Sequence, residues 1–342
     1  MERAASYFSN GTDADGDTVC CQLCPRACSI PGGSLGTCKV RGNINGRGQL
    51  PFYGYVTALA SDPIEKKPLY HFRPGSRILS AGFAGCNFHC PFCQNWRLSQ
   101  STESPGRWMR PDELVSAAIH DGSRSIAYTY SEPLVHVEYL LDCMALVRQH
   151  AIANVLVTNG CINAEAAGEI LSLADAANID LKCFSRDGYV LLGGNLDTVC
   201  AFIRLALEKS VHTEITTLVV PGFNDSPGEL DACAGFIASL HADSGLPRVP
   251  WHLSAYRPEF RWSAPPTNPD FLLQAKKRAA AKLPYVYTGN IQDDNDTHCL
   301  HCHATLVSRR GYRTDTSGLE PPPEGERYYR CALCKNNTSI RG

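Results

Sequence analysis

The sequence predicts an α/β protein built on a partial or full parallel (β/α) barrel, with a small cysteine-rich metal-binding module at each end. Between residues 77 and 290, short β-rich runs alternate with longer helical patterns. Such alternation produces parallel strands joined by right-handed crossovers. Eleven of the 17 cysteines fall into three spaced groups, two of which flank this region. A chain of 342 residues is too long for a disulfide miniprotein, so these groups indicate metal sites.

The expected elements follow one another regularly along the chain. Segments such as "RPDELVSAAI" place proline and acids ahead of apolar periodicity, which is typical of a helix start. In a barrel of this kind the active site lies at the C-terminal ends of the strands. We expect strands at 77–83, 125–130, 154–159, 178–184, 212–220, 250–256 and 284–289. We expect helices near 111–121, 134–149, 163–174, 195–210, 227–241 and 268–282.

Changes in composition divide the chain into four parts. Residues 1–19 are polar and rich in Gly and Asp, so we expect a disordered tail. A cysteine-rich module with its lead-in occupies 20–76, and the barrel occupies 77–290. A C-terminal CxxC…CxxC module occupies 291–342, and its segment "EPPPEGE" is a turn-rich spacer.

Charge and hydropathy exclude some partners and locations. The net charge is −2, so no general basic surface for nucleic acid is expected. No apolar run reaches the length of a membrane span, and the first 19 residues lack the apolar core of a signal peptide. We therefore expect a cytoplasmic protein that binds neither nucleic acid nor membrane.

The central group is one ligand short of a closed metal site. Cys86, Cys90 and Cys93 are spaced C-x3-C-x2-C directly after the first expected strand. Thiolates suit iron–sulfur clusters and zinc, and three ligands leave a metal position open. A zinc ion that takes His89 as its fourth ligand is the alternative.

This spacing, with aromatic Phe92 before the last cysteine, resembles the radical SAM superfamily. The resemblance implies a 4Fe–4S cluster on Cys86, Cys90 and Cys93, which would be the catalytic residues. The unique iron of that cluster chelates S-adenosylmethionine (SAM). In that superfamily an electron from the cluster then cleaves SAM, and the resulting 5′-deoxyadenosyl radical abstracts hydrogen from the substrate.

The resemblance extends to later strand ends. Tyr130, Ser131 and Glu132 in "YTYSEP" stand where the superfamily has a Gly-Gly-Glu motif. Val157 stands where pyruvate formate-lyase activating enzyme has an aspartate, so that enzyme's cation site is not expected here. The residues assigned to SAM binding by this resemblance are Phe92, Tyr130, Ser131, Glu132, Thr158, Asn159, Asp180, Lys182 and His252.

Longer segments narrow the resemblance further. "CQLCPRACSIPGGSLGTCKVRGN", "DPIEKKPLYHFRPGS" and "GCNFHCPFCQNW" are similar to the radical SAM enzymes of the AmmeMemoRadiSam system, which are relatives of the pyruvate formate-lyase activating enzymes. This similarity implies an oxidoreductase that takes an electron from flavodoxin or ferredoxin. Its substrate would be a glycine in a partner protein, as for a glycyl-radical activating enzyme, or a small molecule.

Both flanking groups contain four cysteines. Cys21, Cys24, Cys28 and Cys38 suit zinc or an auxiliary iron–sulfur cluster. Cys299, Cys302, Cys331 and Cys334 resemble a zinc ribbon or a rubredoxin-like site, for zinc or iron. These groups also allow a second hypothesis, a non-catalytic zinc-ribbon protein that binds a partner or nucleic acid.

Overall fold

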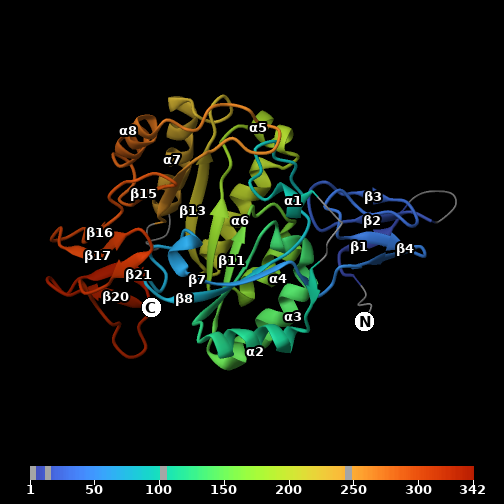
Figure 1. The fold of residues 1–342 in the computed structure, drawn as a ribbon, viewed down its shortest axis with the longest axis horizontal. Helices are drawn as coiled ribbons and strands as arrows, with labels where there is room; N and C mark the ends of the chain where they lie inside the picture. The colour runs from blue at the N-terminus through green and yellow to red at the C-terminus, as the bar shows by residue number, and fades with distance from the viewer. Residues whose placement is uncertain (1–4, 12–16, 101–105, 243–248) are drawn as a thin grey trace.

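A single eight-stranded sheet forms the centre of the molecule (Figure 1). The computed structural model describes residues 5–11, 17–100, 106–242 and 249–342. Seven strands of the sheet are parallel, and only β7 pairs antiparallel, with β8. In spatial order the strands are β15 (Val286–Gly289), β14 (Trp251–Ala255), β13 (His212–Val219), β12 (Ala176–Asp180), β11 (Ala153–Thr158), β10 (Ser125–Thr129), β8 (Arg77–Gly82) and β7 (Ala58–Pro63). The predicted parallel (β/α) architecture is confirmed.

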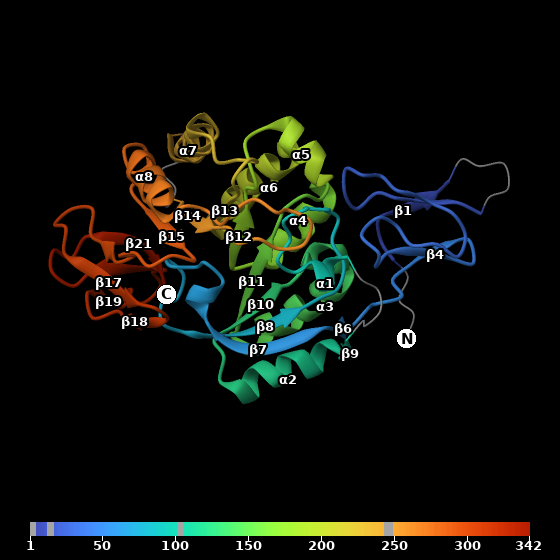
Figure 2. The ribbon, with the colours of Figure 1, turned by 45° about the horizontal axis from the view of Figure 1, so that its top comes forward.

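Helices connect the parallel strands and pack on the outside of the sheet (Figures 1 and 2). Helix α2 shows why they form where they do, because Pro111 occupies its first turn and the Glu113 carboxylate accepts the Arg110 backbone N–H at 2.8 Å. Gly122, at φ 69°, ends that helix in the left-handed conformation. The helices are α1 (Trp96–Ser99), α2 (Pro111–Asp121), α3 (Val137–Val147), α4 (Ala164–Leu173), α5 (Arg186–Leu192), α6 (Leu196–Glu208), α7 (Pro227–Ala242) and α8 (Pro269–Ala279). Short 3₁₀ turns form η1 (Ile64–Lys66), η2 (Pro133–His136) and η3 (Arg148–His150).

The barrel is partial rather than closed. In the described part of the chain, β15 and β7 are the two edges of the sheet and do not pair with each other. The segment that follows β7, including η1, runs near this open seam, and the C-terminal module lies on the same side as β15 (Figures 1 and 2). The seam therefore brings three distant parts of the sequence together.

The N-terminal module consists of short strands beside the barrel (Figure 2). Residues 1–4 and 12–16 of the expected disordered tail lie outside the described residues. The expectation is wrong for the strand inside that tail, because β1 pairs antiparallel with β2. The strands are β1 (Phe8–Asn10), β2 (Val19–Cys21), β3 (Ser29–Ile30), β4 (Gly42–Ile44) and β5 (Arg47–Gln49), followed by β6 (Tyr55–Val56), which pairs with β9 (Arg107–Trp108).

The C-terminal module is made of two three-stranded antiparallel sheets. Main-chain bonds attach it to the segment after β7: Arg341 N–H donates to the His71 carbonyl at 2.7 Å, and Arg73 N–H donates to the Arg341 carbonyl at 2.8 Å. The Arg309 guanidinium also donates to the Tyr70 carbonyl at 2.8 Å. The strands are β16 (Thr297–His298), β17 (Thr305–Arg310), β18 (Arg313–Asp315), β19 (Leu319–Glu320), β20 (Tyr328–Cys331) and β21 (Asn337–Arg341).

Within the described residues, no single helix has the length and apolar character to cross a membrane. Two consecutive helices, Arg186–Leu192 and Leu196–Glu208, together have the length and composition of a membrane span. They are bent by 98° relative to each other.

Candidate active site

The three central cysteines line one cavity at the C-terminal end of the sheet. Cys86, Cys90 and Cys93 follow β8, and their cavity has a volume of about 300 Å³. Gly85, at φ 82°, starts this loop, and a Cβ there would lie 2.5 Å from the Cys38 carbonyl oxygen. Only glycine allows so close an approach between the loop and the N-terminal module.

The environment of these thiols favours a bound cation. Burial raises the pKa of the Cys90 thiol to about 12, and burial together with the Glu132 and Cys90 charges raises the pKa of Cys86 well above its usual value. A lone buried thiolate is therefore unfavourable, whereas iron or zinc would stabilise it. Three half-buried thiols beside an open cavity fit a metal cluster with a free position.

Glu132 joins the ends of two neighbouring strands. Its Oε1 accepts the Leu134 N–H at 3.0 Å and the Thr158 hydroxyl at 2.5 Å, and its Oε2 accepts the Asn159 N–H at 2.7 Å. Burial raises the pKa of this carboxyl to about 7, against the opposing effect of these hydrogen bonds. Glu132 thus fixes the positions of Thr158 and Asn159 beside the cluster loop.

Asn159 extends this network to the cysteines. Its amide donates to Asn87 Oδ1 at 2.9 Å and lies 3.9 Å from the sulfur of Cys86. Asn159, Ser131 and Glu132 all line the cavity, while Tyr130 and Thr158 are not in its wall. Tyr130 instead accepts a hydrogen bond from Lys67 at 3.1 Å.

Asp180 and Lys182 form an ion pair in the cavity wall. The Lys182 ammonium lies 2.8 Å from Asp180 Oδ2 at the end of β12. Burial acts to lower the pKa of Lys182, but the charges of Asp180 and Cys90 outweigh burial and raise that pKa. Both residues line the cavity, as does Phe92, whose ring packs 5.1 Å from the ring of Phe223.

The cavity wall also contains Thr216, Ser254 and Asn290, which the sequence analysis did not identify. Thr216 Oγ1, like Oγ of the expected residue Ser131, is buried and has no hydrogen-bond partner among the described residues. Thr216 comes from β13, Ser254 from β14 and Asn290 from the residue after β15. For Thr216 the sequence did contain a signal, the polar alternation of His212, Glu214 and Thr216. This alternation places the three side chains on one face of a buried strand.

His252 lies apart from the other expected SAM-binding residues. Its Nε2 is 2.7 Å from Glu214 Oε2, and it lines a neighbouring cavity instead of the cluster cavity. Glu214 is fully buried, also bonds His212 Nε2 at 3.0 Å, and accepts the Tyr70 and His71 backbone N–H groups at 3.0 and 2.7 Å. The hydrogen bonds with His212 and His252 keep the pKa of Glu214 well below its usual value, against the effect of burial.

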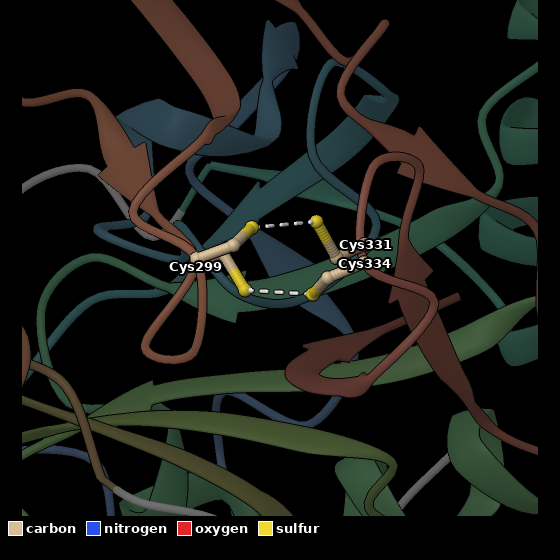
Figure 3. Close-up of side chains that lie close together, drawn as sticks. Cys299, Cys331 and Cys334 are labelled. Carbon is tan, nitrogen blue, oxygen red and sulfur yellow. Dashed lines mark hydrogen bonds between the residues drawn. The ribbon is translucent and has the colours of Figure 1, made fainter.

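The C-terminal cysteines form a compact group (Figure 3). The sulfurs of Cys299 and Cys334 lie 3.6 Å apart, and those of Cys302 and Cys331 lie 3.7 Å apart. All four sulfurs lie within 4.8 Å of one another. Ligands at metal–sulfur distances of about 2.3 Å occupy tetrahedral corners about 3.8 Å apart, so this group fits one tetrahedral ion.

The N-terminal cysteines are also brought together, but less tightly. Cys21, Cys24, Cys28 and Cys38 line one small cavity of about 10 Å³. Within the described ranges, only the C-terminal group has three or more ligand atoms within 4.8 Å of one another. Ligands of an iron–sulfur cluster bind different irons and therefore stand farther apart than ligands of a single ion.

Comparisons with known proteins show which family the central region resembles. A model of the radical SAM superfamily matches residues 82–232. An uncharacterized protein of Methanocaldococcus jannaschii is 36% identical over 332 residues, which cover 95% of this chain and 96% of that protein. A pyruvate formate-lyase-activating enzyme of Staphylococcus aureus is 26% identical over 184 residues, covering 49% of this chain and 72% of that enzyme.

A radical SAM methyltransferase from Sphaerobacter thermophilus has a TM-score of 0.49 and 14% identity, and the match covers 84% of this chain and 76% of that one. The chain belongs to the radical SAM superfamily. The superfamily implies a 4Fe–4S cluster and SAM as cofactors.

Proposed function

We propose that this protein is a radical SAM enzyme whose 4Fe–4S cluster is held by Cys86, Cys90 and Cys93. The observation that carries the proposal is that these cysteines share one cavity with Glu132, Asn159 and the Asp180–Lys182 pair. When bound and reduced, the cluster supplies the electron that cleaves SAM to methionine and the hydrogen-abstracting 5′-deoxyadenosyl radical. The protein must then orient SAM and exclude water.

Several side chains are suited to orienting SAM. Ser131 and Thr216 offer buried hydroxyls that lack partners among the described residues. Lys182 supplies a positive charge for a carboxylate, and Asp180 supplies acceptors for hydroxyl groups. Phe92 provides an apolar surface. Glu132 acts through Thr158 and Asn159, whose positions its carboxylate fixes.

We assign no direct SAM contact to His252. Its ring is held by Glu214 and it faces the neighbouring cavity, so its proposed role moves to that cavity. Tyr130 and Thr158 support the wall of the cluster cavity from behind.

The two flanking cysteine groups receive different proposals. The tetrahedral spacing of Cys299, Cys302, Cys331 and Cys334 favours a single zinc or iron ion with a structural role. The wider N-terminal group, Cys21, Cys24, Cys28 and Cys38, suits an auxiliary cluster or zinc.

We propose flavodoxin or ferredoxin as electron donor, because cluster reduction needs a one-electron carrier. The relationship to a pyruvate formate-lyase-activating enzyme supports a glycine in a partner protein as one substrate class. A small molecule is the other.

The test is anaerobic reconstitution with iron and sulfide, followed by incubation with SAM and dithionite. We expect the broad visible absorbance of an iron–sulfur cluster, about four extra irons per chain, and formation of 5′-deoxyadenosine. A colourless zinc protein that leaves SAM intact would overturn the proposal and support the zinc-ribbon hypothesis.

A further inference from the structure

A second cavity adjoins the cluster cavity at the open seam of the barrel. Its volume is about 450 Å³. Pro68, Ser254 and Asn290 line both cavities, so a molecule in the second cavity lies directly beside the space in front of the cysteines. Pockets for small ligands usually have volumes of about 300–1,000 Å³.

Three separate parts of the chain build the second cavity. Glu65 and Tyr70 come from the segment after β7, and His252 comes from β14. Arg309 and Tyr312 come from the C-terminal module. The module therefore does more than bind a metal ion: it supplies one wall of a cavity next to the candidate active site.

Two charged side chains in this wall have unsatisfied polar atoms. Glu65 is 5% exposed, and its Oε1 accepts the Gly75 N–H at 2.7 Å and the Thr314 hydroxyl at 2.9 Å. Its Oε2 has no partner among the described residues. A buried polar atom without a partner is unfavourable, and a bound hydrogen-bond donor would offset that cost.

Arg309 has a hydrogen-bond donor without a partner among the described residues. It is 4% exposed, and its terminal nitrogens donate to the carbonyls of Asn295 and Tyr70 and to the Thr297 hydroxyl. Its guanidinium lies 4.2 Å from the centre of the Tyr70 ring, so the group is held in place. Its Nε is buried and has no partner in the described part of the chain.

The other charged groups of the wall are already neutralised within the protein. Lys66 pairs with Asp62 at 3.1 Å, and Asp293 pairs with Lys276 at 2.7 Å. His252 directs Nε2 to Glu214, which leaves its Nδ1 as the ring nitrogen for a ligand. Counting the described residues, the wall thus contains one unpartnered acceptor atom at Glu65 and one unpartnered donor atom at Arg309.

We propose that this second cavity is the substrate site. It would take a small polar molecule with both a hydrogen-bond donor group, for Glu65, and a carbonyl or carboxylate group, for Arg309. The inference rests on the proposed radical SAM function and decides between its two substrate classes: the substrate is a small molecule and not a glycine in a partner protein.

The test uses deuterium to find the source of the abstracted hydrogen. Cells that make this protein are grown in deuterated medium, and their extract is separated into a small-molecule ultrafiltrate and a protein fraction. Each fraction is incubated anaerobically with the reconstituted enzyme, unlabelled SAM and dithionite. Transfer breaks a substrate C–D bond and forms a C–D bond in 5′-deoxyadenosine, which mass spectrometry detects. We expect deuterium from the ultrafiltrate and none from the protein fraction.

Substitutions link the transfer to the cavity. We expect Glu65→Gln and Arg309→Lys to lower the deuterated share of 5′-deoxyadenosine at least about tenfold, a loss equivalent to about 1.4 kcal/mol. Because both residues are buried, Tyr312→Ala serves as a second variant whose side chain is 60% exposed. Leu333→Ala, exposed on the same module and outside the cavity wall, is the matched control and should behave like the unchanged protein.

The outcomes separate this inference from the proposed function. Deuterium transfer from the protein fraction alone would overturn the small-molecule site while leaving radical SAM chemistry intact. Folded Glu65, Arg309 and Tyr312 variants that transfer deuterium like the Leu333 control would overturn the cavity assignment. An absence of any 5′-deoxyadenosine would reject the proposed function itself.

Discussion

The central and C-terminal cysteine groups differ in what surrounds their sulfurs. The four C-terminal sulfurs lie within 4.8 Å of one another and complete a tetrahedron. The three central cysteines line a cavity of about 300 Å³ beside an ion pair and two hydroxyls that have no partner in the described ranges. Closed four-ligand sites are typical of structural metals, whereas a missing ligand beside a cavity leaves room for substrate. The surroundings of a cysteine group therefore indicate its role better than the cysteines themselves do.

The largest effect should come from removing the central ligands. Replacing Cys86, Cys90 and Cys93 together with Ala should abolish 5′-deoxyadenosine formation and remove about four irons per chain, since no thiolates remain to hold the cluster. The measurements are iron analysis and chromatography after incubation with SAM and dithionite.

Cys200→Ala is the matched control, because Cys200 is a buried cysteine of α6 outside all three groups. It should keep both iron and product formation. If the triple variant still formed 5′-deoxyadenosine, the distinction between an open and a closed site would collapse.

The closed group should respond in the opposite way. Cys299→Ala or Cys331→Ala should remove one metal ion per chain and lower stability, because binding of a structural metal is coupled to folding. For a loss of about 3 kcal/mol we expect the melting temperature to fall by about 5 °C or more. SAM cleavage in the folded fraction should persist. Variants that keep their melting temperature but lose turnover would show that this ion carries electrons instead.

A third experiment concerns the contact between the cluster loop and the N-terminal module. Gly85→Ala would place an alanine at φ 82° and its Cβ 2.5 Å from the Cys38 carbonyl oxygen. We therefore expect the variant to lose about 2–3 kcal/mol of folding stability. Gly122→Ala is the matched control, since Gly122 has φ 69° with open space around its Cβ position and should cost only about 1 kcal/mol. Urea unfolding compares the two variants, and equal losses would mean that the close approach has no energetic weight.

The location of the candidate site at the C-terminal ends of the strands was predictable, because parallel (β/α) barrels have their active sites there. The expected strand 212–220 closely matches β13, and the expected helix 111–121 coincides with α2. Helix α5 and the antiparallel strand β7 were missed, because elements of six or seven residues carry little periodic signal.

The position of His252 could not be predicted, because it depends on a partner in the neighbouring strand. Glu214 belongs to the polar alternation of β13, but that alternation does not reveal its hydrogen bond to His252 of β14. Likewise the second cavity needs Arg309 and Glu65, which are 244 positions apart in the sequence and meet only when the C-terminal module docks. Such contacts depend on tertiary packing, which spacing along the chain does not reveal.

The smallest effect concerns the junction between the barrel and the C-terminal module. His71 is fully buried there, with Nε2 2.7 Å from the Tyr287 hydroxyl and Nδ1 2.8 Å from the Ser339 hydroxyl. Burial lowers the pKa of His71 from 6.5 to about 3. Below the unfolded pKa the unfolded chain binds a proton that the folded protein does not, so stability is lost as the pH falls from 6.5 towards 3.

At about pH 5 this histidine should cost about 2 kcal/mol of stability relative to neutral pH, at 1.36 kcal/mol for each unit below its unfolded pKa. The His71→Gln variant has no titratable ring at this position. Between about pH 7 and pH 5 its stability should therefore fall by about 2 kcal/mol less than the stability of the unchanged protein. Urea midpoints at the two pH values measure the difference. Because His136, whose pKa burial lowers to about 4, is unchanged in the variant, part of the acid sensitivity should remain. An equal loss of stability in both proteins would show that His71 does not link acid sensitivity to the docking of the C-terminal module.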